Sequence, residues 1–187
     1  MRILAAIFLP LTLACASAGA LAVEPKRADI VAAYAAIPHR LTQFDATSST
    51  ATHKAELARL FAYTDRGVVL RVQGMQAHGT RSADGVRRSV AGYEGLIAEL
   101  GKERFSAEIA PARALIVEAL QLQQRHLQSR PEGGLAFGRA QVVSVREVQE
   151  ASGRLIKAYN LLMRGFPGET QHNKTSFYDH LCALDFL

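Results

Sequence analysis

The stretch Thr52–His78 reads THKAELARLFAYTDRGVVLRVQGMQAH and is the longest helical pattern in the chain. Along it, apolar or weakly polar side chains recur every three or four positions, which is the spacing of one face of an α-helix. The residues of this face are Leu57, Phe61, Thr64, Val68, Val72 and Met75. We therefore predict one long helix over 52–78 that buries this face against other elements.

The same periodicity predicts further helices on both sides of this stretch. Their expected ranges are 25–37, 84–100, 106–129, a helix that begins near 144 and ends at RGFPG (164–168), and a last helix that begins between 170 and 175. Amphipathic helices without a sheet must bury their apolar faces against one another. The predicted fold is therefore an all-α, single-domain bundle of five or six helices.

Several residues have the character of helix boundaries. Gly101 is placed to end the helix 84–100, and Pro111 is suited to the first turn of the next one. Ser144 and Glu147 have the spacing of a capping box. The only strand candidate, AQVVSV at 140–145, is short.

The first residues have the three parts of a secretory signal peptide. Arg2 supplies the positive charge, residues 3–14 are an apolar run too short to cross a bilayer, and ALA at 20–22 offers small residues for cleavage. We expect a signal peptide over 1–22, a helical domain over 23–187, and a periplasmic or secreted protein. The alternative is a lipoprotein anchored to the membrane through Cys15.

The mature chain would be mildly basic. The formal net charge of the full chain is +5, and loss of Arg2 leaves +4. A basic surface suits an anionic lipid or polymer as partner. Export argues against nucleic acid, and the long apolar stretch that a transmembrane helix needs is missing after residue 22.

The last helix carries an Asp, a His, a Cys and a second Asp in Asp179–Asp185, which raises the question of a metal site. On a helical projection these side chains point in different directions, whereas Phe177, Leu181 and Leu184 share one face. We predict that this face is buried, that Cys182 is half-buried, and that Asp185 finds a partner on another helix.

A metal- or haem-binding bundle is the alternative hypothesis, because exported proteins with such cofactors use His and Met. The candidate ligands are Met75, His78, His172 and His180. Met75 and His78 lie three positions apart on one helix, but Met75 is also on the apolar face, where Met often fills core gaps. Under the preferred interpretation the protein needs no cofactor.

Three arginines gather where the helix 84–100 begins. They are Arg81, Arg87 and Arg88. Helix N-terminal N–H groups together with arginines can bind an anion. We predict an anion- or partner-binding surface here, extended by the long loop 130–143.

Three polar residues fall on or beside apolar faces and are expected to bond between helices. They are Asp65 and Arg71 on the long helix and Gln123 on the helix 106–129. Such groups usually fix the register of packed helices.

Motifs of nucleophilic catalysis, such as GxSxG and SxxK, are absent from the sequence. The sequence therefore favours a non-enzymatic exported protein that binds an envelope protein or an anionic envelope component. An enzyme whose site is assembled across helices, without a local motif, is the remaining hypothesis.

Overall fold

The computed structural model describes residues 32–33, 35–36, 49–129, 145–166 and 171–185 of this 187-residue chain. Within these residues the structure contains five long helices and no strand, which confirms the all-α prediction for this part of the chain. The helices are α2 (Ala51–Gly79), α3 (Ala83–Lys102), α4 (Ala110–Gln128), α6 (Arg146–Gly165) and α7 (Gln171–Leu184).

Some predicted elements lie largely outside the described residues. The signal peptide over 1–22 is one of them, and the strand candidate is another except for its last residue, Val145. Of the predicted helix 25–37, the described residues Ala32, Ala33 and Ala35 are helical and Ala36 lies in a turn.

The helix boundaries follow local capping chemistry in two places. Thr50 and Ser82 are the N-caps of α2 and α3, and their hydroxyl oxygens accept from the backbone N–H groups of His53 and Gly85 at 3.2 and 3.1 Å. These bonds satisfy N–H groups that have no partner inside the helix. Pro111 lies in the first turn of α4, as predicted.

Two predicted boundaries are wrong. Gly101 lies inside α3, which continues to Lys102. The N-cap of α6 is Val145, without a side-chain cap, and Ser144 of the predicted capping box lies outside the described residues.

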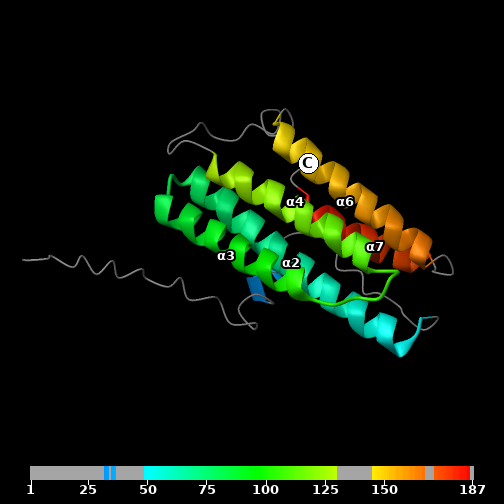
Figure 1. Ribbon diagram of the computed structural model, residues 1–187. Coiled ribbons are helices and arrows are strands. Elements are labelled where there is room, and N and C mark those ends of the chain that lie inside the picture. Colours follow the sequence, from blue (N-terminus) through cyan, green and yellow to red (C-terminus); the bar gives the residue numbers. More distant parts are fainter. Residues whose placement is uncertain (1–31, 34, 37–48, 130–144, 167–170, 186–187) are drawn as a thin grey trace, which may run out of the picture.

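The helices pack around one shared core (Figure 1). α2 contacts α3, α4 and α7, while α4 also contacts α3 and α6, and α6 contacts α7. The largest fully buried side chains come from all five helices and the α3–α4 connection: Tyr93, Phe177, Leu57, Leu60, Leu96, Leu100, Ile109, Ile116, Leu120, Leu127, Leu162 and Leu184. Burial of these side chains is the main driving force for the packing.

α2 lies close to its neighbours at Gly67. A Cβ atom at this position would lie 2.6 Å from Cδ1 of Leu184 and 3.0 Å from Cδ2 of Leu120. The missing side chain therefore lets α7 and α4 approach α2 closely.

Among the described helices, none has both the length and the apolar character needed to cross a membrane.

Candidate functional site

The site lies where α2 ends and α3 begins. The connection is short because Ser82 N–H donates to the Ala77 carbonyl at 2.8 Å and Arg81 N–H donates to the His78 carbonyl at 3.1 Å. Arg81 adopts φ 56°, in the left-handed region that favours glycine. This turn folds α3 back along α2 and leaves the arginine side chain on the outside of the corner.

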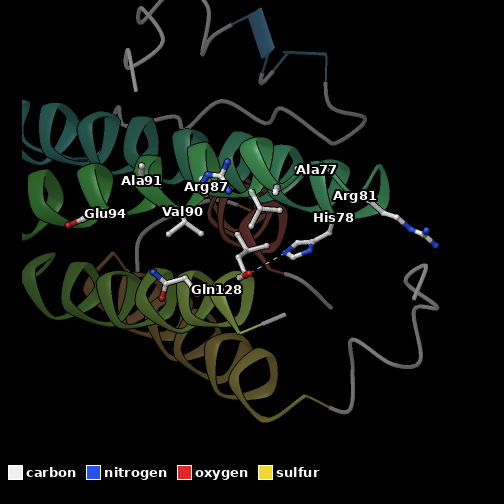
Figure 2. Close-up of a pocket in the computed structure, with 11 residues that line it drawn as sticks. Ala77, His78, Arg81, Arg87, Val90, Ala91, Glu94 and Gln128 are labelled. Atoms are coloured by element: carbon white, nitrogen blue, oxygen red, sulfur yellow. Dashed lines mark hydrogen bonds between the residues drawn. The ribbon is translucent and has the colours of Figure 1, made fainter. Parts of the chain in front are cut away.

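A groove of about 550 Å³ runs between α3 and the end of α4, beside this turn (Figure 2). Its wall is mostly apolar. The lining residues are Ala77, His78, Arg81, Ala83, Val86, Arg87, Val90, Ala91, Glu94, Leu127 and Gln128. We call this hollow the α3–α4 groove.

His78 joins α2 to α4 at one end of the groove. Its Nε2 lies 3.2 Å from the Leu127 carbonyl oxygen, and because a carbonyl only accepts, Nε2 carries the proton. Leu127 belongs to the last turn of α4, where carbonyls lack partners within the helix. The predicted metal ligand His78 thus caps a helix end and holds the groove in shape.

Two of the three predicted arginines line one groove, but their side chains lie apart. Arg81 and Arg87 line the groove, and Figure 2 shows the Arg81 side chain extended away from it into solvent. Arg87 forms an ion pair with Asp84, one turn earlier on α3, and both side chains are largely exposed. Arg88 is exposed but does not line the groove. Three arginines and one aspartate leave this corner positively charged.

Glu94 marks the opposite end of the groove. It lies on α3 far from the α2–α3 turn, and Figure 2 places it and Arg81 at opposite ends of the row of labelled residues. Glu94 and Arg81 therefore mark the two ends of the groove, and Arg87, Val90 and Gln128 lie between them.

The remaining metal candidates lie elsewhere. The Met75 sulfur is 3.6 Å from Nη1 of Arg71, and its side chain packs against Val148. Nδ1 of His180 is 2.8 Å from the Asp65 carboxylate, with the ring stacked on Phe61 at a centroid distance of 4.3 Å.

These candidates do not form one site. Asp65, which holds His180, is thirteen positions before His78 on α2, or about 20 Å along the helix. His172 lies in α7, and its side chain is outside the described residues. Across the described ranges, groups of three or more His, Cys, Asp or Glu side chains suited to a metal ion are absent.

The side chains of α7 lie mostly as the sequence predicts. Phe177, Leu181 and Leu184 are buried as predicted, with exposures of 0, 3 and 0%. Asp185 has its expected partner, since the Ser152 hydroxyl on α6 donates to it at 2.6 Å. The prediction for Cys182 is wrong, because this thiol is exposed.

Interhelical bonds are confirmed for two of the three predicted groups, Asp65 and Gln123. Gln123 accepts from the Tyr93 hydroxyl at 3.0 Å and donates to the Leu184 carbonyl at 2.7 Å, so it ties α4 to α3 and α7. Burial lowers the pKa of the Arg71 guanidinium, while Tyr93 and Asp185 act in the opposite direction. Burial raises the pKa of the Tyr93 hydroxyl.

Sequence reasoning missed the groove itself. Val86 and Val90 have the spacing of the buried face of α3, but both are only partly buried. A local signal was present: Ala83 and Ala91 are small side chains on this side of α3, and small side chains leave a hollow when the neighbouring helix stays in place. The predicted contact loop, 130–143, lies outside the described residues.

Comparisons of this chain with protein-family models, with curated proteins and with solved structures found no match.

Proposed function

We propose that this chain is an exported, non-enzymatic protein, a single-domain helical bundle behind a signal peptide, that binds another component of the cell envelope. The binding site in this proposal is the α3–α4 groove together with the arginines beside it. The bound component is an envelope protein or an anionic envelope molecule.

One observation carries this proposal. Arg81 and Arg87, chosen from sequence as anion-binding residues, both line the same mostly apolar groove. Ligand sites in proteins are concave and mainly apolar, with a few polar groups that orient the ligand. Two other surface hollows, of about 560 and 580 Å³, are lined mostly by polar and charged side chains and lack this combination.

The charge distribution supports an acidic partner. Long arginine side chains keep their guanidinium groups in water while their stems cover apolar surface. The Arg87 guanidinium has five N–H donors, so its contact with Asp84 leaves donors available for a second acceptor.

Site-specific photocrosslinking from α3 tests this function. A photoreactive residue replaces Ala91, which is exposed and lines the groove, in the full chain produced in its own cell. The matched control is Ala98, which lies two turns further on α3, on the same side of the helix, and is exposed outside the groove.

We expect an adduct with an envelope component from position 91 and not from position 98. The adduct should be lost when Arg81 and Arg87 are both replaced by Glu, with helical circular dichroism unchanged. Equal labelling from both positions, or labelling from neither, would refute the proposal.

Export is tested separately by the mass of the mature chain. Cleavage after Ala22 gives a protein that begins at Val23, whereas a lipoprotein would begin at a lipid-modified Cys15.

A further inference from the structure

We infer that the outer face of α6 and α7 binds the surface of an anionic phospholipid bilayer. We call this surface the α6–α7 face and define it by Ile156, Lys157 and Arg164 of α6 and by Lys174 and Tyr178 of α7, all of which are exposed. The α3–α4 groove is lined by other helices. The inference therefore goes beyond the proposed function and is tested separately from it.

The α6–α7 face carries both of the large apolar side chains that the described part of the chain leaves exposed. Ile156 is 57% and Tyr178 is 56% exposed. Apolar side chains that gather on one exposed surface are typical of interaction sites, because they gain free energy when they leave water.

Two contacts place α6 and α7 side by side (Figure 1). The ring of Tyr159 on α6 lies 6.3 Å from the ring of Tyr178 on α7, and the Ser152 hydroxyl on α6 donates to Asp185 after α7. The order of these contacts makes the two helices antiparallel. Ile156 lies between Ser152 and Tyr159 on α6, so it is level with the stretch of α7 that follows Tyr178.

The exposed side chains of each helix point the same way. On a helical projection Ile156, Lys157 and Arg164 fall within about 100° of one another. Lys174 and Tyr178 lie four positions apart on α7 and so share one side of that helix. Apolar and basic side chains therefore form one surface across the two helices.

The exposed charges of this face are all positive. Lys157, Arg164 and Lys174 form no ion pair with a carboxylate of the described residues. The carboxylates of α7 and its end are covered, since Asp179 is 8% exposed and Asp185 is partly buried and accepts from α6. The glutamates of α6 lie in its first two turns, ahead of the face.

Charge complementarity favours an anionic lipid surface over a second copy of this chain. Two copies docked through the α6–α7 face would bring like charges together, which is unfavourable. A peripheral protein binds an anionic membrane through apolar side chains that enter the head-group region and basic side chains around them. Tyrosine is itself enriched at that depth.

The shape of the face also suits a bilayer. Ile156, Lys157 and Arg164 line none of the three surface hollows described for this molecule. A protein partner gains most of its affinity from side chains that fill pockets, which this part of α6 does not offer. Lipid head groups rearrange around projecting side chains and need no pocket.

Vesicle flotation tests the inference. The chain is purified in the form that accumulates in its own cell and is mixed with vesicles of phosphatidylglycerol and phosphatidylcholine in equal parts, or of phosphatidylcholine alone. We expect binding to the mixed vesicles that is at least about tenfold weaker on phosphatidylcholine alone, because each Lys or Arg near an anionic surface contributes about fivefold in affinity. Raising the salt from about 0.1 to about 0.5 M should weaken it.

Matched variants locate the binding surface. Replacing Lys157 and Lys174 together with Gln should weaken vesicle binding by about tenfold or more. Replacing Arg88 and Lys102 with Gln removes the same net charge from α3, which contacts neither α6 nor α7, and should leave binding within about twofold. Ile156→Ser should weaken binding about tenfold without loss of the fold in thermal melts. All variants share one N-terminus, so their comparison is independent of residues 1–22.

A fluorescent probe reports the contact directly. The chain contains no tryptophan, so Ile156→Trp introduces a single indole into the face. Its emission should shift to shorter wavelength on mixed vesicles and be quenched by brominated lipid. Trp at position 98, an exposed position on α3, should show neither change.

Several outcomes would overturn the inference. These are equal binding to the two kinds of vesicle, binding that the Lys157 and Lys174 double variant does not weaken, or equal spectral shifts at positions 156 and 98. A dimer that Ile156→Ser dissociates, in a chain that does not bind vesicles, would assign the face to a second copy instead. The crosslink from position 91 reports on the groove, so its presence or absence decides the proposed function and leaves this inference unchanged.

Discussion

Charged and polar side chains are used in opposite ways at two places in this molecule. Where α7 meets α2 and α6, which we call the C-terminal seam, His180 bonds to Asp65 and Ser152 bonds to Asp185. At the α3–α4 groove the arginines are exposed beside an apolar wall. The polar groups of the seam bond to other residues of the chain, whereas the arginines at the groove are exposed to solvent.

The difference separates structural from binding roles. A buried charge must be compensated within the fold, so the seam contributes specificity of packing. An exposed charge costs little to keep and contributes little to stability, so the arginines at the groove have no comparable structural role. Changes in the seam should therefore alter stability, and changes at the groove should alter binding.

Phe177→Ala should give the largest loss of stability. Phe177 is fully buried and packs against Phe61 and Phe166, with ring centroids 5.8 and 6.2 Å away. Removing such a ring leaves a cavity and costs about 3–5 kcal/mol. Chemical denaturation followed by circular dichroism measures this cost.

The adjacent Tyr178 provides the matched control. It is 56% exposed and makes an edge contact with Tyr159 at 6.3 Å. Tyr178→Ala should cost less than about 1 kcal/mol. Similar losses for the two variants would mean that the buried face of α7 does not anchor the helix.

Two glycines test how tightly the seam is packed. Gly67→Ala brings a Cβ atom to 2.6 Å from Leu184, whose side chain is fully buried and has little room to move. Overpacking of about 1–3 kcal/mol should exceed the helix-propensity gain of about 0.5–1 kcal/mol, so the variant is destabilised.

Gly95 on α3 is the control, because a Cβ atom there meets nothing within 4 Å. Gly95→Ala should raise the melting temperature, since only the helix-propensity gain remains. If both glycine variants are stabilised, the approach of α7 to α2 is looser than the structure describes.

A pair of double-mutant cycles compares the two regions directly. Asp65→Ala and His180→Ala remove a contact whose side chains are 22 and 13% exposed, and their coupling energy should be about 1 kcal/mol. Asp84→Ala and Arg87→Ala remove a pair that is largely exposed, and their coupling should be below about 0.5 kcal/mol. Equal coupling energies would remove the distinction between seam and groove.

Helical periodicity predicted most of the fold and the buried side of the seam. Phe177, Leu181 and Leu184 share one face of their helix wherever the neighbouring helices lie. The sequence alone therefore predicts that they are buried, as they are. Gln123 was recognisable because a polar group on an apolar face needs partners, which Tyr93 and Leu184 supply.

Residues at the edge of an apolar face were harder to place. A projection gives the angle between Cys182 and Asp179 but does not show which part of the helix surface its neighbours cover. Cys182 is exposed and Asp179 is 8% exposed, the reverse of what their distance from the apolar face suggests. The groove was beyond prediction for the same reason, because it depends on three helices at once.

Arg81→Gly should have a small effect on stability and, like Gly95→Ala, should be stabilising. Glycine adopts φ 56° without the steric cost that a side chain incurs there. Relief of this strain should exceed the added entropy of the unfolded chain, and we expect a gain of up to about 1 kcal/mol, seen as a higher denaturation midpoint. Such a gain would indicate that the Arg81 side chain contributes to binding rather than to the stability of the fold. The same variant should weaken the crosslink from position 91, while Arg88→Ala, as control, should change neither property. If Arg81→Gly destabilises the protein and leaves binding intact, Arg81 belongs with the structural residues of the seam.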